Sequence, residues 1–360
     1  MKRIIISGGG TGGHIFPAIS IANALKAIDS SIEILFVGAE GRMEMEKVPA
    51  AGYTIKGLPI AGLQRSLSLK NLLLPAKIYR CLNKAGEIIK TFKPDVVVGV
   101  GGYASAPVLW KAQNMGIPTL VQEQNSYAGL TNKLLGKRAK AVCVAYNGME
   151  RFFSSKKIIH TGNPVRQDLF DVANIKEEAI NFFSLKTDTP TILALGGSLG
   201  ALTLNESITN YLYKLEQENI QLIWQTGKSY YNTALKFSSG RQNVKVFDFI
   251  YNMNYAFAAA DLILSRAGAG TISELCIVGK PAVLIPSPNV SEDHQTKNAM
   301  ALVKENAAIL IKDSDARNNL IPQTIELMRN QLLMKTLGAN IFRLALPNAA
   351  TEIANKILNL

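Results

Sequence analysis

Short apolar runs separated by amphipathic, helix-like stretches recur along the first half of the chain. The runs lie at residues 4–7, 34–37, 95–100, 119–122 and 141–145. Continuous runs of Val, Ile and Leu between helices are typical of parallel strands that are covered on both faces. The pattern therefore predicts a doubly wound α/β domain.

The second half of the chain begins the same pattern again. After a polar stretch, an apolar run at 191–195 leads directly into a glycine-rich loop, and further runs follow at 220–225, 244–247, 262–265 and 282–286. Each half thus opens with a strand, a glycine loop and a helix. We expect two doubly wound domains with a linker near 161–170, and ligands in a cleft between them at the carboxyl ends of the strands.

Length and composition fit this organisation. A chain of 360 residues, 48% of them hydrophobic, can bury two separate cores. Cys81, Cys143 and Cys276 are odd in number and lack metal-site spacing, which favours buried thiols in a reducing compartment. Because no apolar run reaches the roughly 18 residues that span a bilayer, we expect a cytoplasmic protein that is not integral to the membrane.

The net charge is confined to the first half. Residues 1–160 carry 21 Lys and Arg against 9 Asp and Glu, whereas residues 161–360 carry 18 of each. A basic half is compatible with nucleic acid, an anionic membrane surface or an acidic ligand. The stretch at about 47–86 has no acidic residue and mixes lysines with leucines, which favours membrane contact. We expect no nucleic acid, because aromatic residues are few there and no recognition motif is present.

Two glycine loops in the first half are candidate phosphate sites. The loop at 8–13 contains five glycines in six positions, and the loop at 99–107 likewise follows a strand and precedes a helix. Such loops let the backbone approach a phosphate at a helix N-terminus. The first loop also fits the dinucleotide fingerprint, but the candidate acid after the second predicted strand, Glu40, lies beyond Gly38 and farther along the chain than the fingerprint places it, so the fit to a nicotinamide enzyme is poor.

Side chains beside these loops could carry chemistry. His14 could act as a general base, or it could only hydrogen-bond a phosphate or cap the helix. Glu123 and Asn125 close a predicted strand, where they could contact a ligand or cap the next helix. The three histidines, at positions 14, 160 and 294, lack ligand spacing, so we expect no protein-built metal site.

The second half has its own candidate ligand loops. Ser198, in the loop at 196–201, could donate to a phosphate. In the segment 265–274, small residues open a helix and Glu274 sits one turn in, where it could accept two ribose hydroxyls or simply favour the helix N-terminus. His294 and Gln295 open another helix and could reach a sugar or a phosphate.

Six of these segments, in this order, resemble the MurG family, the UDP-N-acetylglucosamine–N-acetylmuramyl-(pentapeptide) pyrophosphoryl-undecaprenol N-acetylglucosamine transferases. The resemblance runs from residue 4 to about 300. The segments are Gly-Gly-Thr-Gly-Gly-His at 9–14, Gly-Gly-Tyr-Ala-Ser-Ala-Pro at 101–107, Glu-Gln-Asn at 123–125, Gly-Asn-Pro-Val-Arg at 162–166, Gly-Gly-Ser-Leu-Gly-Ala at 196–201 and Ser-Arg-Ala-Gly-Ala-Gly-Thr-Ile-Ser-Glu at 265–274.

The resemblance implies a GT-B fold of two Rossmann-like domains around a cleft. Residues 1–163 are then the acceptor- and membrane-binding domain, residues 164–340 bind UDP-GlcNAc, and a C-terminal helix at about 341–360 returns to the first domain. The implied reaction is inverting transfer of GlcNAc to the C4 hydroxyl of the muramyl sugar of lipid I, giving lipid II and UDP. The implied location is the cytoplasmic face of the cell membrane, with no permanently bound cofactor and no metal.

The resemblance also assigns roles to individual residues. His14 or Glu123 is the implied base. The first two glycine loops would share the acceptor pyrophosphate through Gly10, Gly101, Gly102, Tyr103 and Ser105. Residues matching the UDP-GlcNAc site are Thr11, Gly12, Gly13, Asn125, Arg166, Ser198, Ile250, Ala269, Gly270, Thr271, Ile272, Ser273, Glu274 and Gln295.

A UDP-GlcNAc 2-epimerase of the same fold is the alternative enzyme. It would use the same nucleotide sugar, but it would need acid and base carboxylates in the cleft and no membrane face. The basic, apolar stretch at 47–86 argues against it.

Overall fold

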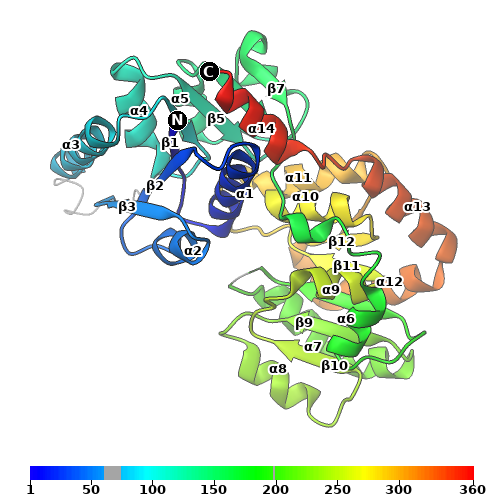
Figure 1. The fold of residues 1–360 in the computed structure, drawn as a ribbon. Helices are drawn as coiled ribbons and strands as arrows, with labels where there is room; N and C mark the ends of the chain where they lie inside the picture. Colours follow the sequence, from blue (N-terminus) through cyan, green and yellow to red (C-terminus); the bar gives the residue numbers. More distant parts are fainter. Residues whose placement is uncertain (61–73, 198) are drawn as a thin grey trace. The chain divides into compact units, whose positions relative to one another are not determined.

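The computed structural model describes residues 1–60, 74–197 and 199–360 (Figure 1). The chain divides into two compact units. Unit 1 comprises Met1–Val165 together with Pro347–Leu360, and unit 2 comprises Arg166–Leu346.

Unit 1 is built on a fully parallel sheet with the strand order β3-β2-β1-β4-β5-β6-β7. This order reverses direction between β1 and β4, which creates the switch point at which doubly wound sheets bind ligands. The strands are β1 (Arg3–Ser7), β2 (Glu33–Ala39), β3 (Thr54–Leu58), β4 (Val96–Gly99), β5 (Thr119–Glu123), β6 (Ala141–Val144) and β7 (Ile158–His160).

Helices cover both faces of this sheet. Successive strand residues point to opposite faces, so Ile4 and Ile6 join one core while Ile5 joins the other. The first core includes α1 and α14, and the second includes α3 and α4. The helices of unit 1 are α1 (Gly12–Ile28), α2 (Glu44–Ala50), α3 (Leu74–Phe92), α4 (Ser105–Asn114), α5 (Leu130–Gly136) and α14 (Ala349–Leu358).

Unit 2 repeats the design with the parallel order β10-β9-β8-β11-β12-β13. Its switch point lies between β8 and β11, and α7 and α12 pack against each other over one face. Its strands are β8 (Thr191–Leu195), β9 (Gln221–Gln225), β10 (Val244–Phe247), β11 (Leu262–Ser265), β12 (Ala282–Leu284) and β13 (Ile309–Leu310). Its helices are α6 (Lys176–Phe182), α7 (Leu202–Gln217), α8 (Tyr231–Ser238), α9 (Met253–Ala259), α10 (Ala269–Val278), α11 (His294–Val303), α12 (Asp313–Arg329) and α13 (Gln331–Arg343).

The two parallel sheets confirm the predicted pair of doubly wound domains. Three strands escaped the sequence analysis: β3, β7 and β13. All three lie at sheet edges, where a strand is short and partly exposed, so no continuous apolar run marks it. Helix α1 starts at Gly12 and contains Pro17 in its second turn.

The stretch at about 47–86, predicted to contact a membrane, is divided among several elements. Helix α2 ends at Ala50, β3 then enters the sheet beside β2, and α3 begins at Leu74. Residues 61–73 lie outside the described residues.

The C-terminal helix α14 lies against α1, so the end of the chain completes a core begun near its start. Ile353 and Ile357 are fully buried in that core, and Lys2 donates to the carbonyl of Ile357 at 3.4 Å. Residues up to Leu346 belong to unit 2, so the returning segment begins at Pro347 rather than at about 341.

Replacing Ile353 by Ala should lower the free energy of unfolding of unit 1 by about 2–5 kcal/mol, because the truncation leaves a cavity under α14. Hydrogen exchange measured by mass spectrometry should show faster exchange in α1 and α14 and unchanged exchange in unit 2. Glu352→Ala, at the exposed neighbouring position, is the control and should stay within about 0.5 kcal/mol. Equal protection in both variants would contradict this account of the core.

Candidate active site

Unit 1 brings its two glycine loops together at the switch point of the sheet. β1 lies between β2 and β4, so the chain leaves the carboxyl ends of β1 and β4 side by side. The loop after β1 leads into α1, and the loop after β4 leads into α4. Both loops therefore lie where a doubly wound sheet binds its ligand.

The two glycine loops lie so close together that Gly102 has no room for a side chain and Gly10 has little. Gly102 has φ +78°, and a Cβ on it would lie 2.3 Å from the carbonyl oxygen of Gly9. Gly10 has φ +89°, and a Cβ there would lie 3.2 Å from the ring of Tyr103. Four of the residues predicted to hold the acceptor pyrophosphate (Gly10, Gly101, Gly102 and Tyr103) thus belong to one compact surface.

Two of the residues predicted to bind the acceptor pyrophosphate, Gly10 and Ser105, hydrogen-bond other groups of the protein. The N–H of Gly10 donates to the carboxylate of Glu44 at 3.1 Å, so this amide is not open to an anion. Ser105 is fully buried, and its hydroxyl donates to the carbonyl of Gly102 at 2.9 Å. Both residues therefore shape the loops through hydrogen bonds within the protein.

His14 lies in the first turn of α1, with its ring against the second glycine loop. A Cβ on Gly101 would come within 2.9 Å of the ring. Nδ1 lies 3.0 Å from the carbonyl oxygen of Val100 and 3.2 Å from Oε1 of Gln124. Because both neighbours are acceptors, Nδ1 carries the proton, and Nε2 of the neutral ring keeps its lone pair.

The surroundings keep this imidazole neutral. Burial lowers the pKa of His14 below its usual 6.5, and this effect outweighs the opposing effects of Glu123, the Val100 carbonyl, Gln124 and Glu44. No described residue hydrogen-bonds Nε2. At neutral pH the ring can therefore accept a proton at Nε2 while Nδ1–H holds it in place.

The carboxylate of Glu123, the second candidate base, accepts several hydrogen bonds within the protein. The side chain is buried, and its carboxylate accepts hydrogen bonds from the N–H groups of Asn125 and Gly129 and from the side-chain amides of Asn125 and Asn132 at 2.9–3.3 Å. All four hydrogen bonds come from the protein itself, so the carboxylate holds the Asn125 loop in place. His14, whose Nε2 has no such partner among the described residues, is the better placed base candidate in unit 1.

Sequence analysis missed a network of buried amides behind His14. Gln124 donates to the Val100 carbonyl at 2.6 Å and to Gln122, while Gln122 donates to Asn163 at 2.9 Å. Asn163 in turn donates to the carbonyl of Gln124 at 3.0 Å. The sequence feature that could have indicated this network is the pair of glutamines, Gln122 and Gln124, at the end of an apolar strand, because polar side chains are seldom buried there.

Unit 2 presents its own loops at the carboxyl ends of β8 and β11. Ser198 lies outside the described residues. Gln225, at the end of β9, was not predicted; it accepts from the N–H of Ile250 at 2.9 Å and donates to the carbonyl of Gly197 at 3.1 Å. It therefore fixes the position of the Ile250 backbone beside the loop after β8.

The segment at 265–274 forms a short loop and the start of α10. Gly268 is the N-cap and has no side chain with which to cap the helix. Ile272 is buried in the core, and the hydroxyl of Ser273 donates back to the carbonyl of Ala269 at 3.2 Å. Of the predicted ligands here, Ala269, Gly270 and Thr271 are partly exposed, whereas Ile272 can offer a ligand only its backbone.

Glu274 and Arg166, predicted on the ribose and on the donor phosphates, form an ion pair. Nε of Arg166 lies 3.1 Å from Oε1 of Glu274, whose side chain is 19% exposed. Burial raises the pKa of the Glu274 carboxyl, and Arg166 opposes that rise. Gln295, in the first turn of α11, accepts from the N–H of Ser287 at 2.8 Å through Oε1.

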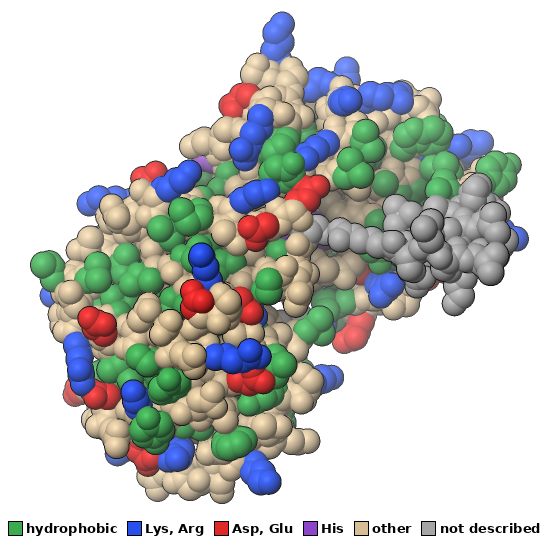
Figure 2. Space-filling model, turned by 180° about the vertical axis from the view of Figure 1, so that it is seen from behind, with side chains coloured by type: hydrophobic (Ala, Val, Ile, Leu, Met, Phe, Trp, Pro, Cys, Tyr) green, Lys and Arg blue, Asp and Glu red, His purple; other side chains and the backbone are tan. Residues whose placement is uncertain are grey.

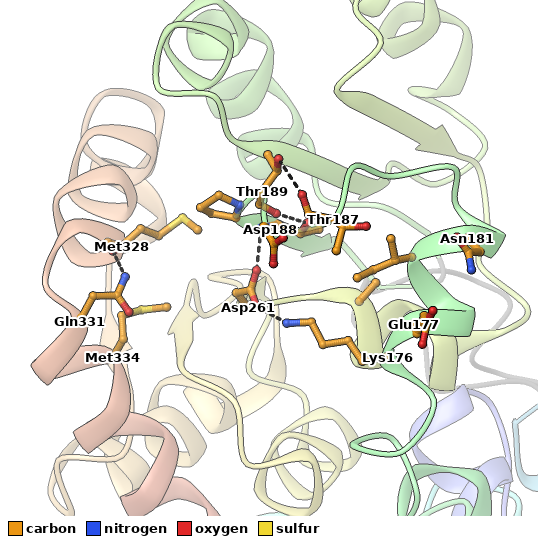
Figure 3. A pocket seen from close by; sticks show the side chains of 14 residues that line it. Lys176, Glu177, Asn181, Thr187, Asp188, Thr189, Asp261, Met328, Gln331 and Met334 are labelled. Atoms are coloured by element: carbon orange, nitrogen blue, oxygen red, sulfur yellow. Dashed lines mark hydrogen bonds and ion pairs between the residues drawn. The ribbon is translucent and has the colours of Figure 1, made fainter.

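A cavity of about 700 Å³ in unit 2 lies away from these loops (Figure 3). Its lining includes Thr191, the first residue of β8, and Asp261, just before β11, so it lies at the amino ends of the strands. Asp261 is paired with Lys176 at 2.9 Å and accepts from the N–H of Thr191 at 2.9 Å. These polar groups are satisfied by the protein, and none of the predicted ligand residues lines the cavity.

Among the residues that the structure describes, no group of three or more His, Cys, Asp or Glu side chains is arranged to hold a metal ion. The described helices also include none that is long and apolar enough to cross a membrane.

Comparison with known proteins gives the same picture over the whole chain. Residues 4–144 match the glycosyltransferase family 28 N-terminal domain, and residues 191–353 match the glycosyltransferase family 28 C-terminal domain. A relative from Cytophaga hutchinsonii is 56% identical over 358 residues, which are 99% of this chain and 96% of the relative. One from Parabacteroides distasonis is 54% identical, covering 99% of this chain and 98% of the relative.

Both relatives are named UDP-N-acetylglucosamine–N-acetylmuramyl-(pentapeptide) pyrophosphoryl-undecaprenol N-acetylglucosamine transferase. Among solved structures, Acinetobacter baumannii MurG superposes with a TM-score of 0.79 at 29% identity, with 100% of each chain covered. A Neisseria meningitidis UDP-GlcNAc 2-epimerase superposes with a TM-score of 0.69 at 16% identity, again over 100% of each chain, which shows the fold alone. The chain therefore belongs to glycosyltransferase family 28 and, within it, to the MurG family that its glycine-rich segments resemble.

Proposed function

We propose that this protein transfers GlcNAc from UDP-GlcNAc to the C4 hydroxyl of the muramyl sugar of lipid I, giving lipid II and UDP with inversion at the anomeric carbon. The observation that carries the proposal is the match, over 99% of the chain, to relatives named for this transfer. In this reaction the protein serves peptidoglycan synthesis.

His14 is the proposed general base. A sugar hydroxyl is a poor nucleophile until its proton is removed. Nε2 of His14 takes that proton, while Nδ1–H stays bonded to the Val100 carbonyl. The hydroxyl oxygen then forms a bond to the anomeric carbon, the bond from that carbon to the UDP oxygen breaks, and its electron pair leaves with UDP.

Unit 2 is the proposed donor-binding unit. The ribose hydroxyls bind Glu274, and Arg166, held beside it, neutralises charge on the departing diphosphate. The N-terminus of α10, at residues 269–271, adds partial positive charge, and the Ile250 backbone contacts the uracil. Gln295 contacts the donor sugar or its phosphate. Ser198 completes the proposed phosphate contacts.

Unit 1 is the proposed acceptor-binding unit. The compact surface of Gly101, Gly102 and Tyr103 faces the acceptor pyrophosphate, and its glycines allow the backbone to approach an anion. Thr11, Gly12 and Gly13, at the start of α1, and Asn125, held by Glu123, contact the donor sugar.

Unit 1 also carries the proposed membrane contact. Ile78 and Tyr79 on α3 are 50% and 66% exposed, and Trp110, on the neighbouring helix α4, is 45% exposed. Arg80 and Lys111 follow them directly in the sequence. On the face drawn in Figure 2, unit 1 presents hydrophobic side chains beside Lys and Arg. Exposed aromatics flanked by cations suit the interface of an anionic membrane, where lipid I resides.

The epimerase alternative has weaker support. The likeness to epimerase structures is confined to the fold at 16% identity, whereas relatives at 54–56% identity are named as transferases. In addition, the buried carboxylate of Glu123 is saturated by four donors, so it does not supply the free acid or base that an epimerase needs.

The purified protein should release UDP from UDP-GlcNAc only when a lipid I analogue is present. His14→Ala should lower kcat by about 10²- to 10⁴-fold, the usual contribution of a general base. Since burial lowers the pKa of His14, kcat/KM of the wild type should fall with decreasing pH only below pH 6.5.

His160→Ala is the matched control for that experiment, because His160 is an exposed histidine at the end of β7 in the same unit. It should retain wild-type activity. UDP release without acceptor would contradict the transferase, and a nearly intact His14→Ala enzyme would remove His14 as the base.

Replacing Tyr79 and Trp110 together by Asp should release the protein from vesicles that contain anionic lipid, because the change puts negative charge where apolar side chains meet the membrane. Co-sedimentation with anionic and with neutral vesicles measures the effect. Phe237→Asp, at a 53% exposed position in unit 2, is the control and should bind as the wild type does. Unchanged co-sedimentation of the double variant would overturn the assignment of this surface.

A further inference from the structure

Glu44 is a buried acidic residue that has no role in the transfer as proposed above. It is the first residue of α2 and is 1% exposed. Its Oε1 accepts from the N–H of Ala39 at 3.0 Å, and its Oε2 accepts from the N–H of Gly10 at 3.1 Å. No Lys or Arg among the described residues forms an ion pair with it. Burying a carboxylate without a cation is unfavourable, so its hydrogen bonds to backbone amides must hold it there.

The first glycine loop is built around this side chain. A Cβ on Gly9 would lie 2.1 Å from Oε1 of Glu44, and a Cβ on Gly38 would lie 2.6 Å from its Cγ. Glycine at both positions therefore makes room for the carboxylate. Through these contacts Glu44 connects the loop after β1 to the carboxyl end of β2.

The loop that Glu44 holds leads directly into the helix that carries His14. Thr11 is the N-cap of α1, and the N–H of His14 donates to the Thr11 carbonyl at 3.1 Å. On its other side, the loop contacts Gly102 through the Gly9 carbonyl. A change in the loop therefore alters both the direction of the imidazole and the surface opposite it.

We propose that Glu44 is a positioning residue of the transfer: its carboxylate fixes the first glycine loop so that His14 meets the acceptor hydroxyl. This inference rests on the proposed function, because it assigns Glu44 to the same reaction. Glu44 acts through the Gly10 amide and does not touch the substrate.

The carboxylate also acts on His14 through its charge. The charged groups that face His14 are Glu123, from the end of β5, and Glu44, from α2, and each raises its pKa. A nearby negative charge favours the imidazolium that forms when His14 takes the proton. Removing the charge of Glu44 should therefore make His14 a weaker base.

Glu44→Gln tests the proposal, because a glutamine can accept only one of the two N–H groups and turns its own NH₂ toward the other. We expect kcat/KM for the lipid I analogue to fall about 10- to 100-fold. The acidic limb of its pH profile should move to lower pH, and UDP binding, measured by calorimetry, should be unchanged. Glu46→Gln is the control, since Glu46 lies on the same helix with its side chain 79% exposed and should behave as wild type.

A second pair of variants separates positioning from general stability. Gly9→Ala places a methyl group against the Glu44 carboxylate and should lower activity strongly. Adding Glu44→Ala removes that clash, so the double variant should be about as active as Glu44→Ala alone. A Glu44→Gln enzyme that matches Glu46→Gln, or one that loses thermal stability with an unshifted pH profile, would overturn the proposal. If the wild type itself releases no UDP with acceptor, the proposed function fails instead.

Discussion

The contact between the two glycine loops of unit 1 is the constraint on which the rest of the site depends. A Cβ on Gly102 would lie 2.3 Å from the carbonyl oxygen of Gly9, so the second loop cannot carry a side chain at the point of contact. The contact exists because β1 and β4 are neighbours in the sheet and their carboxyl ends open side by side. The close approach of the two loop backbones leaves room for the ring of His14 and for the buried side-chain amides that lie behind it.

The same strand topology in unit 2 places different side chains beside its loops. There the loops follow β8 and β11, again neighbours at a switch point, but the nearby charged groups are Arg166 and Glu274 rather than a histidine. An ion pair beside a helix N-terminus is suited to a nucleotide diphosphate and its ribose. A histidine held through Nδ1 is suited to proton transfer. In the proposed reaction, a few side chains at the strand ends thus determine which half of the transfer each unit performs.

The sequence predicted the features that depend on local pattern. Buried central strands such as β4 and β8 are continuous apolar runs, and glycine-rich loops after them are visible in the chain itself. It did not predict the edge strands β3, β7 and β13, because almost none of their residues is buried and no continuous apolar run marks them.

The roles of individual acids were harder to predict. Glu123 and Glu44 are the same residue type, and the sequence does not tell their roles apart. Glu123 accepts hydrogen bonds from the loop that follows its own strand, whereas Glu44, on helix α2, accepts one from the first glycine loop. The contact between Glu44 and Gly10 joins residues 34 positions apart in the chain, and only the folded arrangement brings them together. Gly10 and Ser105, predicted to bind the acceptor pyrophosphate, also have hydrogen-bond partners within the protein, which residue type alone does not reveal.

The central claim is that the Val100 carbonyl fixes the tautomer of His14 so that Nε2 is free to act as a base. Nitrogen NMR of protein labelled at histidine tests it most directly, because the chain has three histidines and His14→Ala identifies the signal. At pH 7 the account predicts a neutral ring with a protonated Nδ1 and an unprotonated Nε2. A proton on Nε2, or a ring already charged at that pH, would contradict it.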